Sequence, residues 1–499
     1  MAVPEEIRKV ERPRNTIVVA YGKNKDRYAV KQRTGCRYSD GRRIPVTGPT
    51  IGHIIDMKYV PIPDWPASCS SQADVELKDW GGASLCDSLF SGTLDDLKEI
   101  YSPEDAKKLY CISLLRACNP GAKDCELKEL YADSFLSELH PGVALSKNTV
   151  SKFLNDVGKQ STRITTFMRK RAASVGLDAH LLVDGTLKSN ESRVNTLSDF
   201  SRKAVVKGSR DISVLYAFDL ERNEPVCSKC FPGNMLDITA YEEFVSDCGI
   251  THGLIVADKG FPADAAVEHY SKNPDLHYLN PIKRNSRFIK THNLFSFTGI
   301  LEGYEGVTYK KAKVNGTKKW LYAFRDTASA SKEERDWLSR VGKEKSFDDK
   351  EFKERQASFG TIVLECDKDL PPETVYAAYS RRWEIEVVMK YYKSACEFDE
   401  TRVHSDYSVI ASEFCDFLAT VLTYRLINKF TATGLLKQRN YGKIMSILRR
   451  AKKVKVGEGE WRLIKMNPGH MKVLESLSLI EPNQTIIHRP VGRPRKQHV

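Results

Sequence analysis

The stretch that most constrains the fold is residues 372–399, PETVYAAYSRRWEIEVVMKYYKSACEFD. It starts after a proline pair, which is typical of the first turn of a helix, and no Gly or Pro follows, so we expect a helix of about seven turns. At about 100° per residue, four polar side chains share a stripe about 60° wide. They are Tyr379, Arg382, Glu386 and Lys393. The opposite side of the helix is apolar, so one side is predicted to pack on a core.

This stripe has two interpretations. Arg382 and Glu386 are spaced i,i+4, so they fit a solvent-exposed surface with an ordinary ion pair. The full spacing, Tyr-x2-Arg-x3-Glu-x6-Lys, resembles the Y-R-E-K signature of a large group of bacterial insertion-sequence DDE transposases. The predicted strand at 359–364 and the sequence RRWEIE at 381–386 agree with that resemblance. It implies an RNase H-like catalytic core in which Glu386 is the third carboxylate of a metal-binding triad.

Two upstream aspartates fit the other two places in the triad. The apolar runs at 180–183 and 253–257 lead directly into Asp184 and Asp258, as expected of buried strands that each deliver a carboxylate. Between them the pattern predicts extended segments at 212–218 and 225–231 and a helix at 237–248. A lone aspartate at a strand end is more often a turn or cap residue. The order strand, strand, strand, helix, strand is RNase H-like. The short sequences FPGN and ADKGF also resemble motifs of the transposase family.

The chain has 499 residues, too many for one ordinary domain. We predict an α/β fold: an RNase H-like mixed sheet with flanking helices, an inserted β-rich region, and an N-terminal β-ribbon followed by helical segments. The predicted regions are a basic β-ribbon at 1–60, a helical region at 61–176, the two parts of the catalytic core at 177–290 and 359–435, an insertion at 291–358, and a basic C-terminal region at 436–499 with a helix over 437–455.

The charge balance points to a polyanionic partner. The net charge is +13 with 78 Lys and Arg residues, and nucleic acid is the commonest partner of such a chain. The basic hairpin within residues 1–60 is a candidate reader of element-end DNA, although an exposed charged hairpin would look the same. Near the C-terminus, Arg493 and Arg495 lie in VGRPRK, which resembles an AT-hook for the A·T minor groove. A disordered basic tail with non-specific phosphate affinity is the alternative.

The remaining composition favours a soluble protein. No apolar run approaches about 18 residues and no charged-then-apolar leader opens the chain, so we expect a cytoplasmic, nucleoid-associated bacterial protein with no membrane partner. The 12 cysteines have no framework spacing, which suits reduced thiols.

Metal-dependent cut-and-paste transposition is the function that the resemblance implies. Two Mg²⁺ ions per site, with Mn²⁺ as an alternative, would be held by Asp184, Asp258 and Glu386 and would neutralise their mutual repulsion. On the same helix, Arg382 and Lys393 would grip phosphates, with Tyr379 as a further hydrogen-bond donor. The partners would be double-stranded DNA, both element ends and target, and a second copy of the chain in the DNA complex. A nuclease of the same fold without strand transfer, or an inactive DNA-binding derivative, is the alternative function.

Trp320 is a further DNA-binding candidate. The segment 318–322, KKWLY, alternates as a strand would, with Trp320 and Tyr322 on one side and Lys319 on the other. Most tryptophans in strands belong to a core. The resemblance places this segment over the active site, where an aromatic ring could stack on an extruded base.

Overall fold

The computed structural model describes residues 3–22, 26–39, 42–62, 75–190, 192–201, 208–235, 237–257, 266–344, 347–382 and 400–481. Five of the predicted site residues lie outside these ranges: Asp258, Glu386, Lys393, Arg493 and Arg495. The chain divides into two compact units, Met1–Val75 and Glu76–Val499, and each is described by itself.

The N-terminal unit is a four-stranded antiparallel sheet with a short helix. Its elements are α1 (Glu5–Lys9), β1 (Thr16–Tyr21), β2 (Arg27–Ser39), β3 (Arg42–Ile55) and β4 (Lys58–Pro61), with the strands paired in sequence order. Register shifts between Val30 and Gly35 interrupt the β2–β3 pairing, as bulges do where a ribbon bends. A small core of Val30, Ile51 and Ile54 holds the sheet together. The predicted N-terminal β-ribbon is confirmed.

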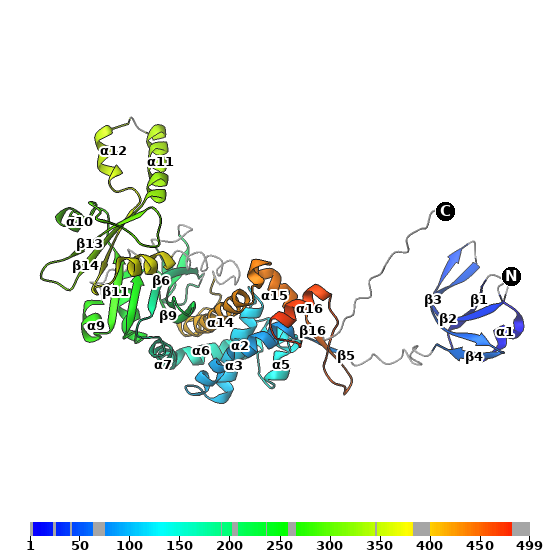
Figure 1. Cartoon of the computed structure of the whole chain (residues 1–499). Helices are drawn as coiled ribbons and strands as arrows, with labels where there is room; N and C mark the ends of the chain where they lie inside the picture. The colour runs from blue at the N-terminus through cyan, green and yellow to red at the C-terminus, as the bar shows by residue number, and fades with distance from the viewer. Residues whose placement is uncertain are drawn as a thin grey trace, which may run out of the picture. The chain divides into compact units, whose positions relative to one another are not determined.

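The second unit begins with helices. Their bounds are α2 (Gly81–Lys98), α3 (Pro103–Cys118), α4 (Leu127–Asp133), α5 (Leu136–Leu139), α6 (Lys147–Lys159) and α7 (Ser161–Ala173). Ser102 and Ser146 cap α3 and α6, because their hydroxyl oxygens accept hydrogen bonds from the backbone N–H groups of Asp105 and Thr149. Both helices pack against α14 (Asp406–Ala432), which is buried along most of its length (Figure 1). The helical segments therefore surround one long apolar helix.

The larger sheet contains the RNase H-like core. Five of its strands are β6 (His180–Ser189), β8 (Arg210–Asp219), β9 (Glu224–Pro232), β10 (Gly253–Ala257) and β11 (Leu276–Pro281). Their spatial order is β9-β8-β6-β10-β11, with β10 parallel to both β6 and β11, and β8 antiparallel to its neighbours. Helices α8 (Asp237–Asp247) and α9 (Val267–Lys272) flank β10 in sequence. The predicted RNase H-like α/β fold is confirmed.

This sheet continues beyond the core without a break. After β11 come β15 (Thr361–Cys366), β14 (Trp320–Asp326), β13 (Val307–Lys313) and β12 (Gly299–Ile300), all antiparallel, while β7 (Asp199–Phe200) pairs with β8 at the other side. Within the described residues the sheet thus has ten strands. The β-rich segment between β11 and β15 is part of the same sheet as the core.

Helices α10 (Arg287–Thr291), α11 (Thr327–Glu344) and α12 (Asp349–Gln356) belong to the same segment. Figure 1 shows α11 and α12 side by side, and the rings of Trp337 and Phe352, one from each helix, lie 5.4 Å apart between centroids. These two helices therefore pack on each other through aromatic side chains.

The C-terminal segment contains η2 (Leu435–Lys437), α15 (Tyr441–Arg450), β16 (Lys452–Val456), β17 (Arg462–Leu463) and α16 (Pro468–Ser476). The helix predicted over 437–455 is correct only for α15, because residues 452–456 pair with β5 (Val75–Asp79) and β17 as the middle strand of a small sheet. No helix within the described ranges is long and apolar enough to cross a membrane.

Candidate catalytic site

Asp184 lies in the central strand of the core. It is half-buried on β6, opposite the buried Tyr216 of β8, and its Oδ1 accepts a hydrogen bond of 2.8 Å from the backbone N–H of Gly185. On the other side of β6, Val183 pairs with Ala257 of the parallel strand β10. The two residues that directly precede the predicted aspartates are therefore neighbours across the sheet.

The helix that carries the Tyr379–Lys393 stripe is described over residues 372–382. It buries Val375, Ala378 and the Tyr379 ring, which is 7% exposed. Arg382 donates a hydrogen bond of 3.1 Å to Tyr379 Oη, and its guanidinium lies 5.7 Å from the centroid of that ring. The structure thus brings Tyr379 and Arg382 together, while Glu386 and Lys393 lie beyond the last described turn.

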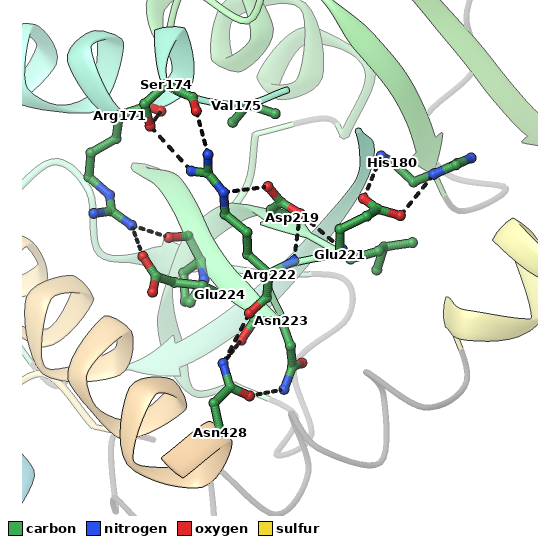
Figure 2. Close-up of polar contacts among 12 residues, drawn as sticks. Arg171, Ser174, Val175, His180, Asp219, Glu221, Arg222, Asn223, Glu224 and Asn428 are labelled. Atoms are coloured by element: carbon green, nitrogen blue, oxygen red, sulfur yellow. Dashed lines mark hydrogen bonds and ion pairs between the residues drawn. The ribbon is translucent and has the colours of Figure 1, made fainter. Parts of the chain in front are cut away.

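Glu221 connects the strand of Asp184 to the helix of Tyr379. This residue lies in the turn between β8 and β9, and its carboxylate accepts hydrogen bonds from the backbone N–H and the Nδ1 of His180, at 2.9 and 3.0 Å (Figure 2). The same carboxylate oxygen that faces the imidazole is 2.9 Å from Nη1 of Arg381. Burial alone would raise the pKa of Glu221, but the hydrogen bonds from His180 and the charge of Arg381 lower it below the ordinary value. We call Glu221, His180 and Arg381 the helix clamp.

The turn that carries Glu221 is itself well fixed. Asp219 Oδ1 accepts hydrogen bonds from the backbone N–H groups of Glu221 and Arg222, each at 2.9 Å, and Arg222 donates to the carbonyl of Ser174 at the end of α7 (Figure 2). Asn428 of α14 donates to the backbone of the turn and exchanges a hydrogen bond with Asn223. The helix clamp therefore rests on a turn that is held from two helices.

Beside this turn, Glu224 lies between two arginines. Its carboxylate is 2.8 Å from Arg171 of α7 and 2.9 Å from Arg425 of α14. Burial would raise the pKa of Glu224, and the two guanidinium groups lower it below the ordinary value. This ion-pair cluster joins β9 to both helices (Figure 2 shows the Arg171 contact).

The other end of β6 carries a buried ammonium group. Lys188 Nζ lies 2.7 Å from Glu413 Oε2 and 3.0 Å from Asp416 Oδ2, both on α14. Asp416 also accepts a 2.8 Å bond from Arg116 of α3. The three side chains nearest the centre are 2–8% exposed. We call Lys188, Glu413, Asp416 and Arg116 the buried charge network.

Opposing effects set the protonation of this network. Burial raises the pKa of Glu413 above its ordinary value, although the charge of Lys188 acts in the other direction. For Asp416 the two cations outweigh burial, and its pKa is lowered. The Lys188 pKa is raised because the charges of Asp416 and Glu413 outweigh the burial of its ammonium group. Asp416 is therefore the firmly ionised partner of both cations.

Trp320 begins β14 and pairs with Lys313 on β13 and with Cys366 on β15. Its ring is half-buried, and the ammonium groups of Lys311 and Lys313 lie 4.7 and 5.5 Å from the ring centroid. Lys319, the sequence neighbour, forms a 2.8 Å ion pair with Glu365 instead. The cations at the Trp320 ring thus come from the adjacent strand.

The helix clamp and the buried charge network were not found from the sequence. The clamp is carried by a turn and depends on side chains 160 residues apart, so no local pattern reveals it. Part of the network could have been predicted from the sequence. Glu413 and Asp416 are acids inside the apolar run of α14, and such acids need buried partners. The identity of the partner, Lys188 on β6, depends on the packing of helix on sheet.

No group of three His, Cys, Asp or Glu side chains that could hold a metal ion occurs among the described residues. Of the three predicted ligands only Asp184 is described, and it is half-buried. Carboxylate oxygens are hard donors that suit Mg²⁺. The described part of the site is therefore compatible with a divalent metal.

Residues 177–410 match the family model of the transposase DDE domain. A search of curated proteins found no match. Among solved structures, the chain was matched to a piggyBac transposase synaptic complex with hairpin DNA, at 12% identity and a TM-score of 0.40, over 74% of this chain and 79% of that one. It was also matched to a Mos1 transposase paired-end complex with the left transposon end, at 12% identity and a TM-score of 0.15, over 32% of this chain and 58% of that one.

The family match begins three residues before β6 and ends inside α14. It therefore includes Asp184, Asp258 and all four residues of the Tyr379–Lys393 stripe. What the chain is similar to, over residues 177–410, is the DDE domain of transposases.

Proposed function

We propose that this protein is a bacterial insertion-sequence transposase of the Y-R-E-K group, which cleaves DNA at the ends of its element and transfers those ends into target DNA. The observation that carries the proposal is the pairing of Val183 with Ala257. Asp184 and Asp258 are the next residues in sequence after this parallel pair, so we expect them to be close, which supports a shared carboxylate site.

The helix clamp supports the third member of the proposed triad. Arg381 is bound to Glu221, which is bound to His180 at the start of β6. Glu386 follows Arg381 by five residues and Asp184 follows His180 by four. A helix fixed this close to the strand is well placed to bring Glu386 toward Asp184, and we assign the triad to Asp184, Asp258 and Glu386.

These three carboxylates would hold the divalent cations, Mg²⁺ or Mn²⁺. When bound, the metal would activate the attacking oxygen and stabilise the leaving oxygen of the phosphodiester. The protein's own task is to position the DNA strand. Arg382, whose guanidinium is held at the Tyr379 hydroxyl, is proposed to bind a phosphate beside the cleaved bond, and Lys393 a second one.

Other proposed DNA contacts lie outside the core strands. Trp320 is proposed to stack on an extruded base, and Lys313, whose ammonium group lies 5.5 Å from the centroid of the Trp320 ring, is proposed to bind an adjacent phosphate. The basic N-terminal ribbon is proposed to bind element ends, and Arg493 and Arg495 the A·T minor groove. We propose that a homodimer brings two element ends together and that the protein acts in the bacterial cytoplasm at the nucleoid.

The triad is tested with purified full-length protein and DNA that carries the element's own terminal sequences. Asp184→Ala, Asp258→Ala and Glu386→Ala should each abolish cleavage in Mg²⁺ while DNA binding without metal stays within about threefold of wild type, because the carboxylates serve chemistry rather than docking. Asp178→Ala is the matched control, because Asp178 is exposed and lies just before β6. A triad variant that cuts at the control's rate would show that its residue is wrongly assigned.

The same assay separates transposition from plain nuclease activity. A supercoiled target plasmid is added, and joined products are measured beside cleaved ends. Joined products that require a free 3′-hydroxyl support strand transfer. Cleaved ends without any joined product would instead favour a nuclease of the same fold.

A further inference from the structure

A cavity of about 700 Å³ opens beside the core, between the segment that follows α3, the N-terminal half of α6 and the segment that precedes α14. Its wall includes residues 119–125, 147–155 in part, and 400–405. Asp184 is not among the described residues that line it. A cavity of this size is large enough for one nucleotide unit of a DNA backbone.

The charges of the wall are unequal. It contains five Lys and Arg residues and three Asp and Glu residues: Arg116, Lys123, Lys147, Lys152 and Arg402 against Asp124, Glu400 and Asp416. Each acid already has a cation of the wall: Asp124 and Asp416 each lie 2.8 Å from Arg116, and Glu400 lies 2.9 Å from Arg402.

The wall's other cations are available for a ligand. Lys123, Lys147 and Lys152 form no ion pair with any described residue, and all three are exposed. The acids of the wall are paired with Arg116 and Arg402. The positive charges of the three lysines are therefore not compensated within the wall. Its net electrostatic preference is for an anion.

The helix α6 adds neutral hydrogen-bonding groups beside these lysines. Asn148, Ser151 and Asn155 line the cavity together with Lys147 and Lys152. On a helix these five positions span an arc of about 140°, so they form one polar surface. Amides, hydroxyls and lysines are the side chains that contact phosphate oxygens and sugars in protein–DNA interfaces, where they fix position without reading the base.

The cavity is connected to the strand of Asp184. The backbone N–H of Thr401, a wall residue, donates a 2.9 Å hydrogen bond to the carbonyl of Ser189 at the end of β6. Ser189 follows Asp184 by five residues, or about 17 Å of extended strand. For a duplex whose axis runs along β6, this distance corresponds to about five base pairs at 3.4 Å each, or half a helical turn.

We propose that this cavity binds the sugar–phosphate backbone of the DNA duplex that is held at the catalytic site, about half a helical turn from the cleaved bond, through Lys147, Lys152 and the polar surface of α6. The proposal rests on the proposed function, because it takes its ligand from the DNA bound at Asp184. It assigns the cavity a positioning role that is independent of sequence.

The first test measures DNA binding by the full-length chain with no divalent metal, so that catalysis does not enter. In Lys147→Gln/Lys152→Gln, the slope of log affinity against log salt should decrease by up to about 1.8, since each phosphate contact contributes about 0.9. Lys128→Gln/Lys472→Gln removes the same charge from exposed lysines outside the cavity and should leave the slope unchanged. Equal slopes in the two double variants would overturn the proposal.

The second test locates the contact on the DNA, first with the wild-type protein and then with the cavity variant. Neutral methylphosphonates are placed one at a time along the element-end DNA. Weakened binding is expected about five base pairs from the cleaved phosphate, and that position should have no effect in Lys147→Gln/Lys152→Gln. An effect that persists undiminished in the variant would assign the contact to other residues and overturn the proposal.

Two further outcomes separate this proposal from related ones. If inorganic phosphate or a mononucleotide binds the wild type but not the double variant, and duplex binding is the same in both, the cavity is a small-anion site and the DNA proposal is wrong. If Asp184→Ala still cuts while the cavity variant shows the expected slope, the triad assignment fails and the DNA-binding cavity stands.

Discussion

The two ends of strand β6 are fixed by different kinds of ionic contact. At its start, the helix clamp is open to solvent: the side chains of Glu221 and Arg381 are 43% and 40% exposed. Near its end, the buried charge network has side chains that are 2–8% exposed. An exposed ion pair contributes about 0–1 kcal/mol, whereas removal of one partner of a buried pair costs about 3–5 kcal/mol.

The difference separates folding from positioning. The buried charge network joins β6 to α3 and α14, so its loss removes part of the core. The helix clamp joins β6 to the helix of Tyr379, and water can replace its contacts if they break. We therefore expect the buried end to determine stability, and the exposed end to determine where the catalytic helix lies.

Asp416→Ala should have the largest effect on stability. It removes one ion pair from Lys188 and one carboxylate from Arg116, so the free energy of unfolding should fall by about 3–5 kcal/mol. Urea unfolding followed by circular dichroism measures the loss, with Asp178→Ala as the control. A loss below about 1 kcal/mol would mean that the buried charge network contributes no more to stability than the exposed helix clamp does.

Glu224→Gln should have an intermediate effect, because Glu224 is 18% exposed and binds Arg171 and Arg425. Hydrogen bonds to charged groups contribute about 1.5–3 kcal/mol each, and Gln retains part of them, so a loss of about 1–3 kcal/mol is expected.

The effect of Glu224 should depend on pH. Its pKa is lowered in the folded protein, so its stabilisation is complete above the ordinary pKa of a glutamate, about 4.3, and is lost as the pH falls through the lowered value. The difference in unfolding free energy between wild type and variant should therefore be largest near pH 7 and shrink in acid. A difference that stays constant down to pH 3 would contradict the charge-based explanation.

Glu221→Gln should have the smallest effect on stability, at most about 1 kcal/mol, and a larger effect on cleavage. Gln can still accept a hydrogen bond from His180 but no longer pairs with the charge of Arg381, so the helix loses its fixed position. We expect the cleavage rate at saturating DNA to fall about tenfold with unchanged DNA affinity, because misplaced catalytic groups slow chemistry.

Arg381→Gln is the partner variant for this experiment. It should slow cleavage to the same extent, and the double variant should be no slower than either single one, as expected for two residues that act through one contact. Additive effects would show that Glu221 and Arg381 act separately and that the helix clamp has no positioning role.

Local features of the fold were predictable from the sequence, and long-range ones were not. The caps at Ser102 and Ser146 and the apolar run before Asp184 depend on neighbouring residues, so their patterns were sufficient. The strand at Lys452–Val456 was predicted as helix, although its alternation of Lys and Val is a local pattern that favours a strand, and it pairs with β5 and β17.

The candidate site was predictable to a similar degree. The Tyr379–Arg382 contact follows from helical spacing, and the structure has it. The contacts of Lys311 with the Trp320 ring and of Glu221 with Arg381 depend on strand register and on a turn, which a single sequence does not encode in any short pattern. The positions of Asp258, Glu386 and Lys393 stay predictions.

The unbroken sheet from β6 to β14 has a consequence for the way DNA is handled. Four inter-strand steps separate the strand of Asp184 from the strand of Trp320. At about 4.8 Å per step, the two strands lie roughly 19 Å apart, and each pair of neighbouring strands between them is hydrogen-bonded. Because these strands are hydrogen-bonded within one sheet, we expect the distance between β6 and β14 to stay fixed. If Trp320 stacks on an extruded base as proposed, the change of shape that brings the base there must come from the DNA, through unstacking and bending.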